Sequence, residues 1–325
     1  MGLVGFKRAA RRALSWPSQA VSWVVLSMAV GLVAYSGTAS AGSDPQILAS
    51  IPPLAMIARD VAGGKAQVSV LNQNGSPHHR VLKPSDIRAM TSADIILWVG
   101  LPLEQYMVRF ESRYTDKMLA MLEHTSDATH LYNDGHSHHD ATDHHGHAHG
   151  SVDPHIWLSE QATIELALVI ADRLSALNPP QSKYYQANAA RFAEQVSASQ
   201  NQWAQQLAPH RDAPYFVYHN AYQYLEKSLA IANQAVLTVN PGIKPTAAQL
   251  GRLAKTLDGV TKACVFYEPE FQQIRLDRVT NAQLYYQVLD PLGSQFQLSS
   301  DQPNQYIRFM NGLVDQLSGC LSQLK

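Results

Sequence analysis

The sequence predicts an α/β protein of two lobes, each with a mostly parallel sheet, joined by one long rigid helix. Short apolar, β-prone runs alternate with helical stretches through most of the chain, the pattern of parallel βαβ units. The two halves have similar strand and helix content, and an uninterrupted helical stretch separates them. With 325 residues, 46% of them hydrophobic, the chain can bury real cores, which excludes disorder and a small disulfide scaffold.

Residues 1–41 have the order of a secretory signal peptide. Four basic residues between Lys7 and Arg12 precede an uncharged run over 21–35, and a triplet of small residues ends at Ala41. We expect cleavage after Ala41 and export of a soluble chain. A membrane anchor is the alternative interpretation, but the run is shorter than the ~20 residues that a spanning helix needs.

Charge and cysteine content narrow the function classes further. Cleavage removes four of the 25 Lys and Arg and none of the 26 Asp and Glu, so the mature chain is mildly acidic. Nucleic acid is therefore not an expected partner, because phosphate binding needs a clustered cationic face. In an oxidising compartment we interpret Cys264 and Cys320 as one disulfide, the alternative being two unpaired buried thiols.

Seven β-prone runs are candidate strands. Those of the first half are Ile47–Ile51, Gln67–Leu71 and Asp94–Val99, and those of the second half are Tyr215–Tyr218, Gln234–Val239, Ala263–Tyr267 and Leu284–Leu289.

The stretch from Ser182 to Leu207 predicts the long helix. It contains neither Gly nor Pro, and its apolar residues recur at helical spacing. At 1.5 Å per residue it would span roughly 39 Å, enough to connect two lobes; an ordinary helix packed inside one domain is the alternative. We divide the mature chain into an N-terminal lobe (42–180), the connecting helix (181–208) and a C-terminal lobe (209–325).

Half of the 14 histidines lie close together in the first half of the chain. They are His136, His138, His139, His144, His145, His147 and His149. The surrounding segment, 133–151, has no large apolar residue and predicts a mobile surface loop. It is either an auxiliary collector of metal ions or a chance low-complexity insertion.

Polar side chains also follow the predicted strands, where open α/β sheets bind ligands. His219, Glu268 and Asp290 each come directly after a strand of the second half. His78 lies a few residues beyond a strand of the first half, and His155 follows the histidine-rich segment. Three imidazoles and two carboxylates are a plausible tetrahedral site for a borderline-soft cation, although each residue alone is as readily structural.

Four segments resemble, in the same order, the ligand segments of the cluster A-I solute-binding proteins of the periplasmic zinc-binding type. They are Gly75-Ser76-Pro77-His78 with Leu82-Lys83-Pro84-Ser85-Asp86, then Asp153-Pro154-His155-Ile156-Trp157-Leu158-Ser159, then Tyr215-Phe216-Val217-Tyr218-His219-Asn220-Ala221-Tyr222, and Leu289-Asp290-Pro291-Leu292-Gly293. The histidine-rich loop, the long helix and the late cysteine pair are also features of that family.

The resemblance implies a single tight Zn²⁺ site in the cleft between the lobes. His78, His155 and His219 would ligate the metal, with Asp290 or a water in the fourth position, while Glu268 lines the cleft without a ligand role. The chain would be a periplasmic monomer that delivers zinc to a membrane permease with a cytoplasmic ATPase, and not an enzyme.

The sequence departs from the family's pattern beside the first histidine. Pro77 stands where a Glu is common, and His79-Arg80 stands where an acidic and an aromatic residue are common, so His79 could replace His78 after a small loop shift.

Three other functions remain open at this point. A manganese-binding member of the family would tend to have Glu at position 219, since carboxylates suit the harder Mn²⁺. A zinc hydrolase needs a general base, and no His-Glu-x-x-His motif is present. A metal store would hold several ions, mainly in the loop.

Overall fold

The computed structural model describes residues 44–72, 75–126, 152–238, 245–270, 275–277, 279–297 and 302–325. The predicted signal peptide and the histidine-rich segment 133–151 lie outside these ranges, so both stay predictions. Within the described ranges, no helix combines the length and the apolar character needed to cross a bilayer.

A four-stranded parallel sheet forms the N-terminal lobe. Its strands are β1 (Gln46–Ala49), β2 (Gln67–Val70), β3 (Ile95–Trp98) and β4 (Met118–Ala120), in the order β2-β1-β3-β4. Helices α1 (Pro52–Ala62), α2 (Pro84–Ser92) and α3 (Val108–Glu111) belong to its connections. Strand β3 is buried at every position, as expected for a parallel sheet covered on both faces.

The C-terminal lobe repeats this arrangement. Its strands are β5 (Tyr215–Val217), β6 (Ala235–Val236), β7 (Lys262–Tyr267) and β8 (Gln283–Val288), all parallel and in the order β6-β5-β7-β8. Helices α6 (Gln223–Leu229) and α7 (Ala247–Thr256) connect them. The same strand order in both sheets confirms the predicted pair of α/β lobes.

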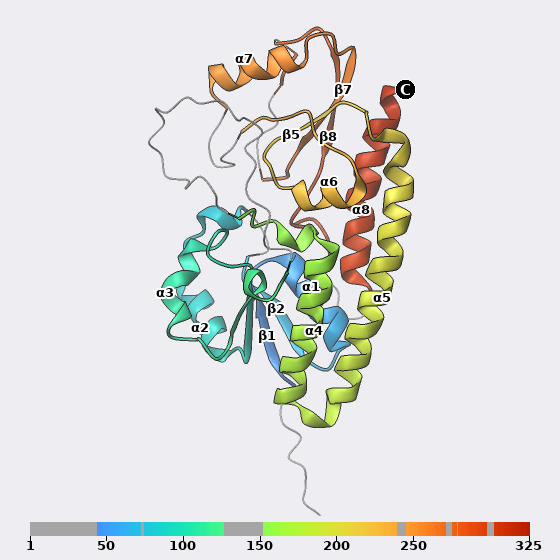
Figure 1. The fold of residues 1–325 in the computed structure, drawn as a ribbon. Coiled ribbons are helices and arrows are strands. Elements are labelled where there is room, and N and C mark those ends of the chain that lie inside the picture. Colours follow the sequence, from blue (N-terminus) through green and yellow to red (C-terminus); the bar gives the residue numbers. More distant parts are fainter. Residues whose placement is uncertain are drawn as a thin grey trace, which may run out of the picture. The chain divides into compact units, whose positions relative to one another are not determined.

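Helix α5 (Ser182–Leu207) has the predicted bounds and connects the lobes. It packs against α1 and α4 (Glu160–Leu177) of the N-terminal lobe, and against α6 and α8 (Gln305–Leu321) of the C-terminal lobe. Figure 1 shows α5 and α8 side by side. Its buried residues include those that the periodicity indicated, namely Tyr185, Ala189, Phe192, Val196, Trp203 and Leu207.

Helix α8 also ties the two lobes together at its first turn. Asp60 of α1 accepts hydrogen bonds from the backbone N–H groups of Gln305 (3.0 Å) and Tyr306 (3.1 Å). The carboxylate thus satisfies donors that a helix N-terminus leaves free, and its negative charge lies at the positive end of the helix dipole. A residue of the N-terminal lobe therefore caps a helix of the C-terminal lobe.

The hydrophobic core follows from the alternation of side chains along the strands. Ile47, Ile95, Val217 and Phe266 point to a central core shared with α1, α4, α5 and α8, whereas Ile96 and Phe216 belong to separate clusters on the other faces. The two sheets therefore share one core, and the same helices pack against both of them.

Seven short 3₁₀ helices complete the described structure. They are η1 (Pro77–His79), η2 (Gln105–Met107), η3 (Met121–Glu123), η4 (Ile156–Leu158), η5 (Pro179–Gln181), η6 (Ala208–His210) and η7 (Ser322–Leu324).

All seven predicted strands are confirmed, with ends that differ by up to a few residues. Strand β4 was not predicted, because its sequence Met-Leu-Ala has no β-branched residue and no alternation. The predicted disulfide between Cys264 of β7 and Cys320 of α8 is present, with the two Cα atoms 6.1 Å apart.

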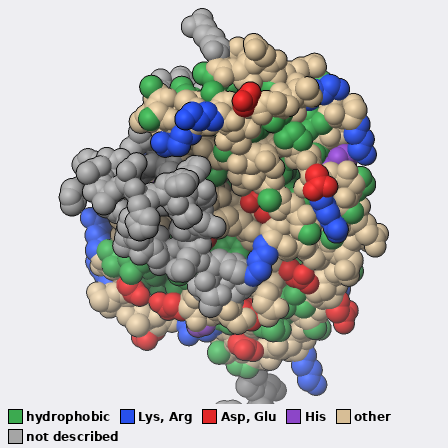
Figure 2. Space-filling model, turned by 45° about the horizontal axis from the view of Figure 1, so that its top comes forward, with side chains coloured by type: hydrophobic (Ala, Val, Ile, Leu, Met, Phe, Trp, Pro, Cys, Tyr) green, Lys and Arg blue, Asp and Glu red, His purple; other side chains and the backbone are tan. Residues whose placement is uncertain are grey.

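On the face in Figure 2, basic and acidic side chains are interspersed.

Candidate metal site

Three histidines from separate segments meet in one pocket. His78 lies in η1, after β2; His155 directly precedes η4; and His219 follows β5. One ligand nitrogen from each lies within 4.8 Å of the other two, close enough for the three to hold one metal ion. His155 and His219 are buried, and His78 is partly exposed. The structure therefore brings together all three histidines expected to ligate the metal.

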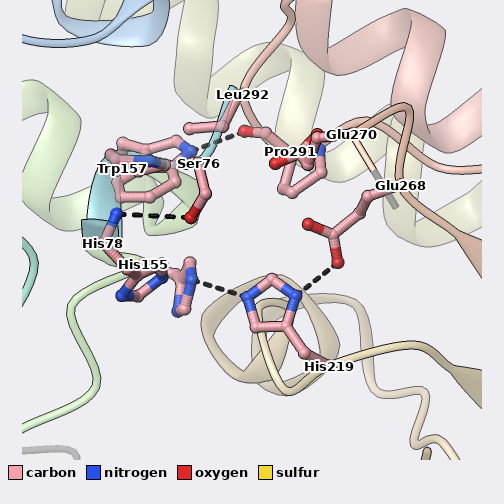
Figure 3. Close-up of a pocket in the computed structure, with 10 residues that line it drawn as sticks. Ser76, His78, His155, Trp157, His219, Glu268, Glu270, Pro291 and Leu292 are labelled. Carbon is pink, nitrogen blue, oxygen red and sulfur yellow. Dashed lines mark hydrogen bonds and ion pairs between the residues drawn. The ribbon is translucent and has the colours of Figure 1, made fainter. Parts of the chain in front are cut away.

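Carboxylates orient two of the imidazole rings. His155 Nδ1 lies 2.8 Å from Oδ1 of Asp153. His219 Nδ1 pairs with Oε1 of Glu268, and Figure 3 shows this second pair. A carboxylate at Nδ1 favours the tautomer with its proton there, which leaves the Nε2 lone pair for a metal. Glu268 is thus more than a cleft-lining residue, because it fixes the ring of a candidate ligand.

The Nε2 atoms of these two rings face each other. The Nε2 atoms of His155 and His219 lie 3.1 Å apart. With both Nδ1 atoms protonated, two lone pairs would point into the same space, which is unfavourable without a cation. In a tetrahedral site with bonds of about 2.05 Å, two ligand nitrogens lie about 3.3 Å apart. The observed spacing is therefore close to that of a zinc-bound pair.

The charges around the pocket favour a cation. Burial lowers the pKa of His219, but the charge and hydrogen bond of Glu268 act in the opposite direction and the net shift is upward. Burial raises the pKa of Glu270 to about 7, and the nearby Glu268 and Asp290 also raise it. These carboxyl groups repel one another, so a divalent cation would relieve their repulsion.

Hydrogen bonds from the C-terminal lobe hold the segment that carries His155. Trp157 Nε1 donates to the carbonyl oxygen of Pro291 (2.7 Å), and the Tyr306 hydroxyl donates to the carbonyl oxygen of Trp157 (2.8 Å). The Tyr224 hydroxyl donates to the carbonyl oxygen of Asp153 (3.0 Å). The Trp157 ring also packs edge-on against that of His155, with centroids 5.2 Å apart. His155 is consequently fixed from both lobes.

Asp290 is not part of the group of converging nitrogens. Its Oδ1 accepts from Leu292 N at 3.1 Å, and its Oδ2 accepts from the Ser294 hydroxyl at 2.9 Å and from Gln295 N at 3.1 Å. The carboxylate thus stabilises its own loop in this structure. Its place as fourth ligand, like the exchange of His79 for His78, stays a prediction.

Sequence reasoning missed two residues that shape the pocket, and Figure 3 labels both. Trp157 and Glu270 both line it. Glu270 comes two residues after Glu268, beyond the end of β7, so its place after a strand was the available signal. Trp157 belongs to the segment that carries His155, but its partner Pro291 is distant in sequence, so no local pattern indicated the contact.

Comparisons with known proteins show the family of this chain. The family model for the periplasmic component A of the zinc-uptake complex, ZnuA, matches residues 47–320. The chain belongs to the ZnuA family. The high-affinity zinc uptake system protein ZnuA of Yersinia pestis is 32% identical over 291 residues, which cover 85% of this chain and 91% of that protein. ZnuA of Haemophilus ducreyi is 32% identical over 303 residues, 86% and 94% of the two chains.

Solved structures share the fold of this ZnuA family member. A crystal structure of ZnuA has a TM-score of 0.68 at 22% identity and covers 85% of this chain and 98% of its own. Zn(II)-bound AdcA from Streptococcus pneumoniae has a TM-score of 0.64 at 22% identity, over 86% of this chain and 58% of its own. The predicted architecture of two parallel-sheet lobes and a long connecting helix is thereby confirmed.

Proposed function

We propose that this ZnuA family member captures Zn²⁺ between its two lobes and delivers it for import. The observation that carries the proposal is the convergence of three imidazoles, two of them with Nε2 atoms 3.1 Å apart and carboxylates at Nδ1. Neutral imidazole is a good ligand for Zn²⁺, and three converging rings, two of them buried, suit one tightly held ion.

Zinc is favoured over manganese by the ligand set. Mn²⁺ prefers oxygen ligands, whereas this pocket offers three nitrogen ligands and uses Asp153 and Glu268 to orient two of them. His219 is the discriminating residue, since a Glu in its place would give the harder site. We assign the fourth position to Asp290 or to a water.

The proposal implies partners and a location. Transport energy would come from a membrane permease with a cytoplasmic ATPase, and the chain would act as a monomer in the periplasm after removal of residues 1–41. We divide the exported chain into lobes 42–180 and 209–325 with the helix 181–208 between them, and assign it no enzymatic activity. The histidine-rich loop would hold further ions weakly.

Metal analysis and competition titration of the mature protein beside His219→Glu test the proposal. We expect wild type to retain one Zn²⁺ against a chelator, and the variant to lose zinc affinity and gain relative affinity for Mn²⁺. A wild-type protein that prefers manganese when both metals are buffered to cellular levels would overturn the zinc assignment.

A loop-deleted protein separates capture in the cleft from storage. Deleting residues 136–149 should leave one tightly bound zinc ion, because the three ligands lie outside that segment. Loss of the tight ion would favour a metal store over a transport component.

A further inference from the structure

The loop between β2 and α2 carries His78, and one side chain crosses it. The guanidinium of Arg80 donates from one terminal nitrogen to Oδ1 of Asn72 at 2.8 Å, and from the other to Oδ2 of Asp86 at 3.1 Å. Asn72 stands where the loop leaves the end of β2, and Asp86 lies in the first turn of α2. Arg80 therefore bridges the beginning and the end of the segment that presents His78.

Both partners of Arg80 are themselves fixed. Asn72 is 3% exposed; its backbone N–H donates to the Ser50 carbonyl oxygen at 3.1 Å, and its side-chain amide donates to the carbonyl oxygen of Gly75 at 3.1 Å. Asp86 Oδ2 also accepts from the backbone N–H of Lys83 at 2.9 Å, which ties the carboxylate to the start of α2. The bridge thus connects two anchored points and not two loose side chains.

We propose that Arg80 is a positioning residue for His78, an inference that rests on the proposed zinc function. His155 and His219 have their rings oriented by Asp153 and Glu268. Arg80 lies two residues after His78 in the same loop. Its guanidinium holds the loop backbone in the conformation that directs the His78 ring toward the other two histidines. Arg suits this role because its fork of donors makes two directed hydrogen bonds at once, which the single ammonium of Lys cannot reproduce.

The consequence concerns the rate at which zinc leaves. Without the bridge, the loop must be ordered whenever His78 binds, and that ordering opposes binding. A loop that reopens readily shortens the residence of the ion, whereas the first encounter with His155 and His219 is unaffected. Removal of an outer partner of a metal ligand commonly weakens metal affinity about 10–100-fold, and we expect an effect of that size, mainly in the dissociation rate.

The experiment is a double-mutant cycle on the mature, zinc-loaded protein. Arg80→Gln is combined with His78→Ala, and each form is studied by zinc competition titration and by chelator-driven release. Arg80→Gln alone should speed release about 10-fold or more, while in the His78→Ala background it should change release less than about 2-fold. Arg88→Gln, the same charge change at an exposed position of α2, is the control.

Each outcome is decisive. Equal losses from Arg80→Gln in both backgrounds, or no loss in either, overturn the role of Arg80 while His78 remains a ligand. If His78→Ala itself leaves zinc binding unchanged, the proposed ligand set fails, and this inference with it. If denaturation of the zinc-free protein shows that Arg80→Gln folds poorly, Arg80→Lys replaces it. The lysine retains the charge but cannot make both hydrogen bonds of the bridge, so the same loss of zinc retention is expected. Wild-type zinc retention in Arg80→Lys would overturn positioning by two directed bonds.

Discussion

The indole Nε1 of Trp157 donates a hydrogen bond to the backbone carbonyl oxygen of Pro291, 2.7 Å away, across 134 positions of sequence. Trp157 belongs to the N-terminal lobe and stands two residues after His155, while Pro291 follows β8 of the C-terminal lobe. Both line the same pocket as the three histidines. The bond therefore fixes the distance between the lobes at the point where a shared ion would be held.

Trp157→Phe should weaken both folding and zinc binding. The substitution removes the donor and leaves the buried carbonyl oxygen of Pro291 without this partner, which costs about 1–3 kcal/mol of unfolding free energy. Because His155 loses part of its packing, zinc affinity should fall as well. Urea denaturation of the zinc-free protein and competition titration measure the two effects.

Trp203→Phe is a matched control for that substitution. Its Nε1 donates to Oδ1 of Asn311 at 2.6 Å, between α5 and α8, and Trp203 does not line the pocket. The control should lose stability and keep zinc affinity. If Trp157→Phe behaves in the same way, the bond to Pro291 supports the fold and not the site.

Glu268→Gln should lower zinc affinity about 10–100-fold, since a carboxylate at Nδ1 raises the basicity of a ligand imidazole and fixes its tautomer. The amide keeps the size of the side chain and an acceptor oxygen, but not the charge. Isothermal titration against a competing chelator measures the loss. Glu226→Gln, another buried glutamate of this lobe that bonds the Tyr215 hydroxyl, serves as control; an equal loss there would assign the effect to general destabilisation.

Seven of the eight described strands and the long helix could be predicted from the residues, and the three histidines followed from the resemblance of their segments to the family. Strand and helix patterns are local. His219 and Glu268 lie just beyond the ends of β5 and β7, where an open sheet exposes its ligand-binding edge. The disulfide could be predicted because the chain offered no competing cysteine.

The orienting contacts could not be predicted in the same way. The pairing of His219 with Glu268 spans 49 residues, and the contact of its Nε2 with that of His155 spans 64. Such pairs depend on how the two lobes pack, which no local pattern specifies. The hydrogen bonds of Asp290 are different, because they lie within its own loop and agree with the structural role that the sequence left open for each of these residues.

The buried carboxyl group of Glu104 should make the free energy of unfolding depend on pH. Burial raises the pKa of Glu104 from 4.5 to about 7, against hydrogen bonds from Ser50, Gly100 and Val99 that lower it. Between those values the folded chain retains a proton that the unfolded chain has lost, so stability falls as pH rises from about 4.5 to about 7. The total change is on the order of 3 kcal/mol.

Glu104→Gln cannot ionise and should therefore flatten this part of the pH profile. Thermal unfolding of the zinc-free protein between pH 5 and 8, with chelator present, compares the slopes. Glu123→Gln at an exposed position should retain the wild-type slope. A Glu104→Gln slope equal to that of wild type would mean that Glu104 is already ionised in the folded chain at pH 5.

The disulfide should stabilise the C-terminal lobe without contributing to the affinity for zinc. Cys264 and Cys320 are 56 positions apart, and closing a loop of that size restricts the unfolded chain by about 4 kcal/mol in the chain-entropy model. Neither cysteine lines the pocket. The double variant Cys264→Ala/Cys320→Ala should thus unfold at lower urea concentration and keep its zinc affinity within about 2-fold.

Reduction of the wild-type protein should reproduce the loss of stability, because it removes the same cross-link without creating a cavity. A large loss of zinc affinity in both forms would instead show that the link between β7 and α8 holds Glu268 in place against His219.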